Sequence, residues 1–245
     1  MPPETEGGLL PSPDTLGDNM RLDPGCRAVC FDMDGTLLDT KVDYKAISDA
    51  VFASLERSDY PNELIEYDRP YKHNVDRWFA WMQEQGRSEE AKRMADAMNS
   101  EITDIEMARV GEAVPFPGVP EMLRALRSKG YRTGVLTRGN RMYAESALRI
   151  SGVSGLLDGL VTRDDYPESE AKPAPIAMVH KAEAVGVRPE EITYVGDHKY
   201  DWLSSVGISA KFVAVKSGTY SEQDWLALDP DMVIVDTAAD IIRFI

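Results

Sequence analysis

The sequence repeats one pattern six times: a short apolar run that stops at polar turn residues. The runs cover residues 28–31, 133–136, 159–161, 192–195, 212–215 and 232–235. A short apolar run closed by turn residues is typical of a strand buried on both faces of a parallel sheet. Stretches with helical periodicity lie between the later runs, at 119–129, 140–151, 173–186, 200–207 and 238–243. This alternation predicts an α/β fold built on a Rossmann-like, doubly wound parallel sheet.

One connection is far too long for a simple crossover. About a hundred residues separate the first run from the next one, near Tyr131. Residues 41–113 carry no strand-like alternation, and their apolar spacing predicts helices over 43–57, 73–85 and 88–109. We therefore predict a small helical cap domain inserted between the first and second strands.

These patterns define the expected domains. The α/β core is predicted to comprise residues 25–40 and 114–245, with the helical cap at 41–113. Residues 1–24 hold five prolines and an excess of acidic side chains, so we expect a disordered tail.

Composition narrows the function classes. The 245 residues carry a formal charge of −15, which argues against nucleic acid or an anionic membrane as a partner. Two cysteines, Cys26 and Cys30, exclude a disulfide scaffold and a four-cysteine zinc site. No apolar run approaches the roughly 18 residues of a membrane span, and the first residues do not read as a targeting signal. We expect a cytoplasmic protein that is a monomer or a homodimer.

Polar residues that can carry chemistry follow three of the predicted strands and precede one helix. The first strand ends in Asp32-Met33-Asp34-Gly35-Thr36, whose two carboxylates can aim at one point for covalent attack and proton transfer. By itself, this pattern fits a solvated Asp-Gly turn equally well.

Three further positions are weaker when taken singly. Thr137 ends the second run and can bind an oxyanion, although a helix N-cap is the commoner role. Lys172 precedes a proline-led helix and can direct a positive charge into a site, although a solvated lysine is commoner. Asp197 and Asp201 follow the fourth run, and their hard oxygen ligands suit Mg²⁺. Because the carboxyl ends of parallel strands meet at one edge, these residues can converge.

The combination of these motifs resembles the haloacid dehalogenase superfamily over about residues 28–245. The resemblance implies that Asp32 is a nucleophile that forms an aspartyl-phosphate and that Asp34 is the general acid and base. It implies that Thr137 and Lys172 bind phosphate oxygens, and that Lys172 also orients Asp32. Asp32, Asp197 and the backbone carbonyl of Asp34 would bind Mg²⁺, with Asp201 as a further acidic partner.

The resemblance also implies a substrate-binding loop and a lid. The backbone N–H groups of Gly35 and Thr36 are expected to hold phosphate oxygens, and Arg138 and Gly139 are expected to contact substrate. The insert lies where phosphoglycolate phosphatase-like members carry a helical cap, which favours a small phosphorylated metabolite as substrate. Cap candidates for a second anionic group on that substrate are Arg69, Lys72, His73 and Arg77, although a solvated helix face is the simpler interpretation.

The same motifs also distinguish a phosphatase from members of the superfamily with other activities. Dehalogenases lack the second acid of the first motif, so Asp34 favours phosphoryl transfer. Hexose phosphomutases carry a histidine just after this motif, and the stretch Asp39–Tyr44 has none. A phosphonate hydrolase would need a Schiff-base lysine from the insert, and nothing in the insert marks one. A phosphatase is therefore predicted, with a phosphomutase or a non-catalytic binding protein of the same fold as alternatives.

Overall fold

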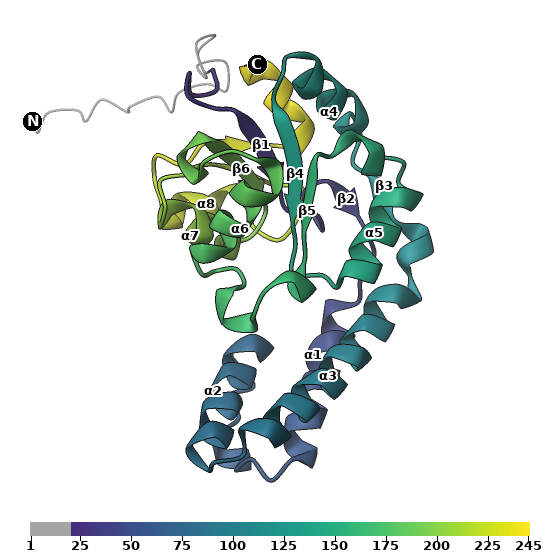
Figure 1. The fold of residues 1–245 in the computed structure, drawn as a ribbon, viewed down its shortest axis with the longest axis vertical. Helices are drawn as coiled ribbons and strands as arrows, with labels where there is room; N and C mark the ends of the chain where they lie inside the picture. The colour runs from purple at the N-terminus through teal and green to yellow at the C-terminus, as the bar shows by residue number, and fades with distance from the viewer. Residues whose placement is uncertain (1–20) are drawn as a thin grey trace, which may run out of the picture.

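Six parallel strands form the central sheet of the computed structural model, which describes residues 21–245 (Figure 1). The strand order is β5-β4-β1-β6-β7-β8. Their bounds are β1 Ala28–Phe31, β4 Arg132–Leu136, β5 Gly159–Val161, β6 Ile192–Gly196, β7 Lys211–Val215 and β8 Ile234–Val235. This sheet and the helices on both its faces confirm the predicted α/β class.

The helices of the core pack on the two faces of the sheet. They are α4 Val119–Ser128, α5 Arg141–Ile150, α6 Ile176–Val185, α7 Lys199–Val206 and α8 Glu222–Leu228. Successive side chains of a strand point to opposite faces, so Val29 and Phe31 pack with α4 and α5, while Ala28 and Cys30 pack with α6. All four residues of β1 are fully buried, as expected for a central parallel strand.

Three details of the core differ from the sequence prediction. Residues 238–244 form a 3₁₀ helix rather than an α-helix, and the last strand is confined to Ile234–Val235. Helix α8 was not predicted, although Ser221 caps it and accepts a hydrogen bond from the Asp224 N–H. Seven residues give too little periodicity to be recognised without that cap.

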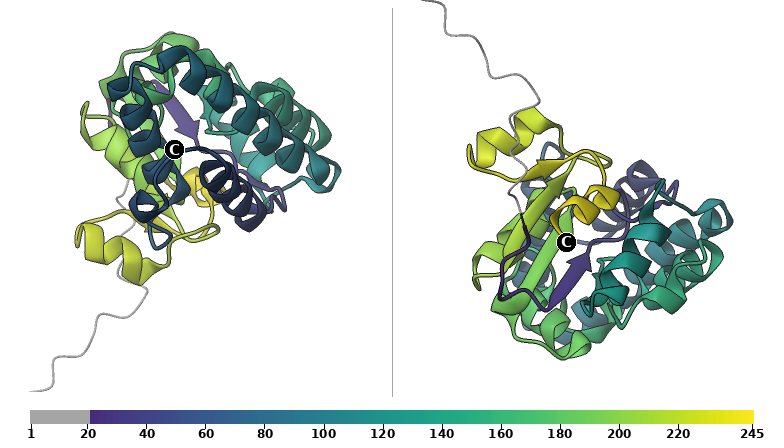
Figure 2. Two further views of the ribbon diagram at one scale, coloured as in Figure 1. Left: turned by 90° about the horizontal axis from the view of Figure 1, so that it is seen from below. Right: turned by 90° about the horizontal axis from the view of Figure 1, so that it is seen from above.

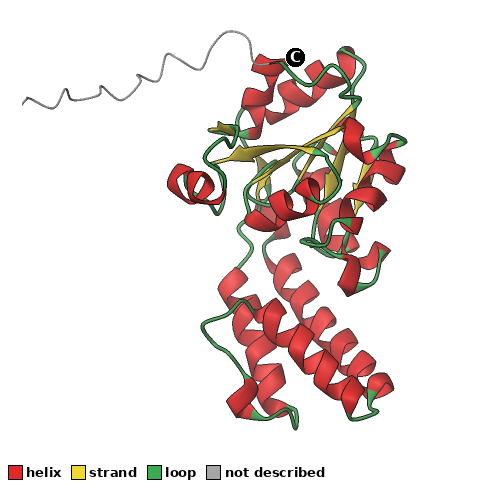
Figure 3. Cartoon of the chain, turned by 90° about the vertical axis from the view of Figure 1, so that its left-hand side faces the viewer, coloured by secondary structure: helices red, strands yellow, loops and turns green. Residues whose placement is uncertain are grey.

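Three helices form an insert between the first and second core strands. They are α1 Tyr44–Arg57, α2 Tyr71–Glu84 and α3 Ser88–Ala108. Figure 3 shows these helices projecting from one end of the sheet. In Figure 2 they lie in front of the sheet when the molecule is seen from below, and behind the sheet when it is seen from above. We call α1, α2 and α3 the helical insert.

A short antiparallel ribbon forms the stem of the helical insert. Strand β2, Leu38–Asp39, pairs with β3, Val114–Pro115, so the chain leaves and re-enters the core side by side. Two-residue strands leave no readable alternation, so the sequence pattern did not predict this ribbon.

The helical insert has its own hydrophobic core. Trp78 and Met82 of α2 are fully buried against Val51, Leu55 and Ile102 of the neighbouring helices. Trp78 is therefore a packing residue of the helical insert.

Shorter 3₁₀ helices occupy several connections: Asn62–Leu64, Val110–Glu112, Ser154–Leu156, Arg163–Asp165, Glu168–Glu170 and Pro189–Glu191. The predicted tail at 1–24 lies outside the described residues except for its end, where the Leu22 N–H donates to the Phe244 carbonyl at 2.9 Å. Within residues 21–245, no helix is both long enough and apolar enough to cross a membrane.

Candidate active site

The carboxyl ends of three neighbouring strands open into one cavity. Asp32 follows β1, Thr137 follows β4 and Asp197 follows β6, and the cavity beside them has a volume of about 860 Å³. Its wall includes most of the predicted site residues: Asp32, Asp34, Gly35, Lys72, Thr137, Arg138, Gly139, Lys172, Asp197 and Asp201. The structure thus brings together residues that are as much as 169 positions apart in the sequence, as parallel strand order requires.

Lys172 lies at the centre of this group. Its ammonium donates to Asp32 Oδ1 at 2.7 Å, to Asp201 Oδ1 at 2.6 Å and to the Leu136 carbonyl at 3.0 Å. The side chain is 4% exposed. Burial alone would lower the pKa of Lys172, but the charges of Asp201 and Asp32 raise it above its ordinary value. Lys172 is therefore a fixed positive charge that orients the Asp32 carboxylate.

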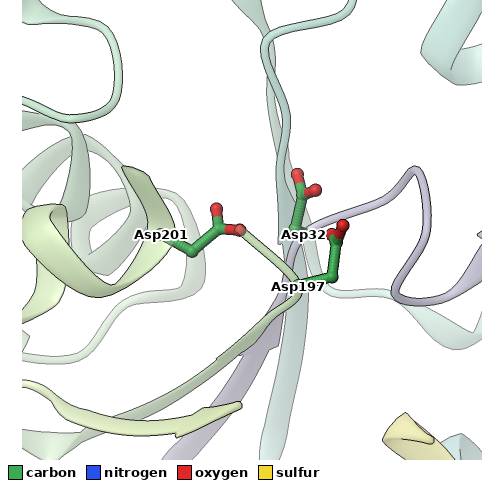
Figure 4. A group of neighbouring side chains, drawn as sticks. All are labelled: Asp32, Asp197 and Asp201. Carbon is green, nitrogen blue, oxygen red and sulfur yellow. The ribbon is translucent and has the colours of Figure 1, made fainter. Parts of the chain in front are cut away.

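Three carboxylates face a common space. Oxygens of Asp32, Asp197 and Asp201 all lie within 4.8 Å of one another. Figure 4 shows Asp32 and Asp197 side by side, with Asp201 reaching toward them from the first turn of α7. An all-oxygen donor set with surplus negative charge fits a hard divalent cation such as Mg²⁺. The Asp34 carboxylate is not part of this trio.

The electrostatics of the trio support that fit. Burial raises the pKa of Asp32 to about 7, with Lys172 opposing and the Asp201 and Asp34 charges adding to the rise. Burial and the Asp32 charge raise the pKa of Asp197 to about 6. The single positive charge of Lys172 does not balance the negative charges of three carboxylates. A bound divalent ion would supply the missing positive charge.

Asp197 is positioned by groups on two other loops. Its Oδ1 accepts from the Thr36 hydroxyl at 3.0 Å, and its Oδ2 accepts from the Thr219 N–H at 2.8 Å. A Cβ atom at Gly218 would lie 2.1 Å from Asp197 Oδ2, so only glycine allows the loop this close. Gly35, at φ 78°, would likewise bring a Cβ atom within 2.9 Å of the same oxygen.

Asp34 is held from two sides. Its Oδ1 accepts from the Thr40 hydroxyl at 2.6 Å and from the Tyr143 hydroxyl of α5. Burial raises the pKa of Asp34, with these two hydroxyl groups opposing the rise. The carboxyl group can therefore carry a proton more readily than a solvated aspartate.

Thr137 is buried with its hydroxyl at the cavity. The hydroxyl oxygen accepts from the Gly139 N–H at 3.0 Å. Because this bond uses the oxygen as an acceptor, the hydroxyl proton can be donated to an anion in the cavity.

The helical insert contributes one predicted residue to the cavity wall. Lys72 is 11% exposed, and its ammonium lies 2.7 Å from Glu168 Oε1, which also accepts from Arg138 at 2.8 Å. Arg69 and Arg77 do not line the cavity, and both pair with Glu66 in the segment before α2. His73 also lies beside Glu66. The structure therefore does not support Arg69 or Arg77 as substrate ligands.

The first motif closes its own turn. The Gly35 N–H donates to the Leu38 carbonyl at 2.9 Å, so in this structure it is engaged within the turn, because a buried backbone group must find a partner. Thr36 is fully buried and absent from the cavity wall, and its hydroxyl donates to Asp197. The phosphate contact of the Thr36 backbone N–H stays a prediction.

Comparison with known families agrees with this site. A family model described as haloacid dehalogenase-like hydrolase matches residues 26–203, and a HAD-hydrolase-like model matches residues 170–241. The chain belongs to the haloacid dehalogenase-like (HAD) hydrolase family. The first match spans all four motifs, so the family predicted from them is confirmed.

Relatives of this HAD protein carry the names of phosphatases. The pyrophosphatase PpaX of Oceanobacillus iheyensis is 26% identical over 89% of this chain and 96% of its own. A phosphoglycolate phosphatase of Nitrosospira multiformis is 25% identical over 85% of this chain and 91% of its own. A solved hydrolase from Pseudomonas syringae shares the fold, with a TM-score of 0.62 and 20% identity over 89% of this chain and 96% of that one. The HAD protein described here is a phosphatase, as the sequence predicted.

Several residues of the HAD site were not recognised from the sequence. Thr40 and Tyr143 bind Asp34, and Thr219 binds Asp197. Thr40 follows the first motif closely and could have been suspected, whereas Tyr143 sits in an ordinary amphipathic helix and carried no signal.

Proposed function

We propose that the protein is a Mg²⁺-dependent phosphatase that hydrolyses a small phosphorylated metabolite through an aspartyl-phosphate on Asp32. The observation that carries this proposal is the Lys172 ammonium, which holds Asp32 at 2.7 Å beside the carboxylates of Asp197 and Asp201. A nucleophile held by a buried cation, next to a second acid in the same cavity, is suited to covalent phosphoryl transfer.

In the first step, a carboxylate oxygen of Asp32 attacks phosphorus and forms a new O–P bond. The bond from phosphorus to the leaving-group oxygen breaks, and Asp34 donates a proton to that oxygen. Lys172 keeps Asp32 oriented, and the Thr137 hydroxyl donates a hydrogen bond to a phosphate oxygen. Fixed donors aimed at the reacting group lower the barrier because they need no rearrangement during the reaction.

In the second step, Asp34, now ionised, takes a proton from water as the water oxygen attacks phosphorus. The Asp32–phosphorus bond breaks, inorganic phosphate leaves, and both carboxyl groups return to their starting states. One residue serves first as acid and then as base because the proton it gives up in the first step makes it the base for the second.

Asp32, Asp197 and Asp201 are the side chains that would hold Mg²⁺, together with the Asp34 carbonyl. The bound ion would offset the negative charge of the phosphoryl group and of the carboxylates around it.

We further propose that the helical insert is a cap that covers the cavity and contacts the leaving group. Its residues Tyr44, Ile47, Tyr71 and Lys72 form part of the cavity wall. Lys72 and Arg138 bring two cations to the cavity wall, where they share the single carboxylate of Glu168, which suits a metabolite with a second anionic group. The two relatives differ in their named substrates, so the choice among such metabolites needs a direct test.

The test is a phosphate-release screen of phosphorylated metabolites with Mg²⁺ and with EDTA, followed by acid quench of the active reaction. We expect Mg²⁺-dependent release from a compact group of acidic substrates and an acid-stable phosphoenzyme that disappears in Asp32→Asn. Turnover that persists in EDTA would contradict the metal, and turnover by a folded Asp32→Asn protein would contradict the nucleophile.

A further inference from the structure

Tyr143 connects the helix after the second motif to the acid of the first motif. It lies in the first turn of α5, is 1% exposed, and donates its hydroxyl proton to Asp34 Oδ1. Thr40 donates to the same oxygen from the stem of the helical insert, at 2.6 Å. Among the described residues, no side chain donates to the other oxygen, Oδ2.

The place of the Tyr143 ring is set by its surroundings. A Cβ atom at Gly139 would lie 2.9 Å from the ring, so the ring packs directly on the loop that carries Thr137. The Asn140 side chain caps α5 and accepts from the Tyr143 N–H at 3.3 Å. The hydroxyl group is therefore fixed by the helix, the loop and the hydrophobic core together, and has little freedom to turn away from Asp34.

We infer that Tyr143 is a positioning residue that holds Asp34 by Oδ1 and leaves Oδ2 as the oxygen that exchanges the proton. This inference rests on the proposed function, in which Asp34 is the acid and then the base. A carboxylate that is free to rotate would spend part of its time with neither oxygen aligned, and proton transfer falls steeply with misalignment.

The consequence differs between the two steps of the reaction. With p-nitrophenyl phosphate, the leaving group departs without a proton, so formation of the phosphoenzyme does not depend on Asp34. Breakdown of the phosphoenzyme still needs Asp34 to take a proton from water. A misaligned Asp34 therefore slows the second step selectively, which lowers kcat and KM together and leaves kcat/KM nearly unchanged.

The experiment compares Tyr143→Phe with Tyr166→Phe and Asp34→Asn, using p-nitrophenyl phosphate as the probe. Tyr143→Phe keeps the ring and removes only the hydroxyl group. Tyr166→Phe is the matched control, because Tyr166 is a buried tyrosine outside the cavity wall whose hydroxyl has no hydrogen-bond partner among the described residues. Steady-state kinetics, the fraction of phosphoenzyme after acid quench, and melting temperature are measured for each.

We expect kcat of Tyr143→Phe to fall about 10- to 100-fold, with kcat/KM changed less than about threefold and phosphoenzyme accumulating. Tyr166→Phe should show none of these changes. Three outcomes would overturn the inference: wild-type kinetics for Tyr143→Phe, an equal fall in kcat and kcat/KM without phosphoenzyme, or failure of this variant to fold. Wild-type turnover by Asp34→Asn would instead overturn the proposed role of Asp34, so the two failures are distinguishable.

Discussion

Arg163 and Glu106 form a two-pronged ion pair that joins the core to the helical insert. Arg163 follows β5, Glu106 lies near the end of α3, and each guanidinium nitrogen is 3.2 Å from one carboxylate oxygen. The side chains are 12% and 7% exposed. Burial raises the pKa of Glu106, although Arg163 beside it opposes the rise. This pair fastens the end of α3 that lies beside the core to the segment that follows β5.

We expect Arg163→Ala to loosen the helical insert. The substitution leaves Glu106 buried without its partner, at a cost of about 3 kcal/mol in the free energy of unfolding. Urea denaturation measures this cost, and limited proteolysis in the stem measures the loosening.

The double variant Glu106→Gln/Arg163→Met serves as the control for the pair. It removes both charges, so we expect it to be more stable than Arg163→Ala alone. Equal stability of Arg163→Ala and the wild type would show that the pair does not hold the insert.

Asp32→Asn should abolish turnover while the protein stays folded. The amide has the size of the carboxylate and keeps an oxygen for Lys172, but it is not a nucleophile. We expect kcat to fall by more than about 10⁴-fold, with circular dichroism and melting temperature close to those of the wild type. A fall of less than about tenfold in the folded variant would exclude Asp32 as the attacking group.

The stability of the metal-free protein should fall as pH rises from about 4 to 7. Burial raises the pKa of Asp32 to about 7 and that of Asp197 to about 6 in the folded chain, above the ordinary value of an aspartate. These two groups therefore bind more protons in the folded state than in the unfolded state, and their contribution to stability is lost as they ionise. Burial lowers the pKa of His198 to about 4, which offsets part of this loss in the same window. Thermal melts in EDTA across the window measure the trend. A flat or rising profile would contradict these pKa values.

Mg²⁺ should reverse this trend because it binds the ionised carboxylates. We expect a larger rise in melting temperature on adding Mg²⁺ at about pH 8 than at about pH 5. Asp197→Ala should show a smaller rise than the wild type at the higher pH. The same rise in both proteins would place the ion elsewhere.

Gly218→Ala should weaken Mg²⁺ binding without contacting the ion. The new methyl group would lie 2.1 Å from Asp197 Oδ2 and must displace that carboxylate or the loop. We expect the affinity for Mg²⁺ to fall at least about tenfold, measured by calorimetry. Gly155→Ala is the matched control, since a Cβ atom there meets nothing within 4 Å. Equal affinities in the two variants would contradict this role for Gly218.

The strands, the main helices and the four motifs could be predicted from the sequence because each depends on local chemistry. A buried parallel strand must be apolar along its length, and its end must turn, so runs such as Ala28–Phe31 and the residues that close them stand out. The same order of strands requires Asp32, Thr137 and Asp197 to meet at one edge.

Only the tertiary structure decided what supports those residues. Tyr143 donates a hydrogen bond to Asp34, and the absence of a side chain at Gly218 makes room for the Asp197 carboxylate. Both contacts join segments more than 20 residues apart, and such contacts leave no periodicity in the sequence. The choice of Lys72 over Arg77 depended on the rotation of α2 about its own axis, and packing around Trp78 sets that rotation. Arg69 lies before α2 and pairs with Glu66 instead. Local pattern determined the reacting groups of this protein, and the packing of distant segments determined how they are held.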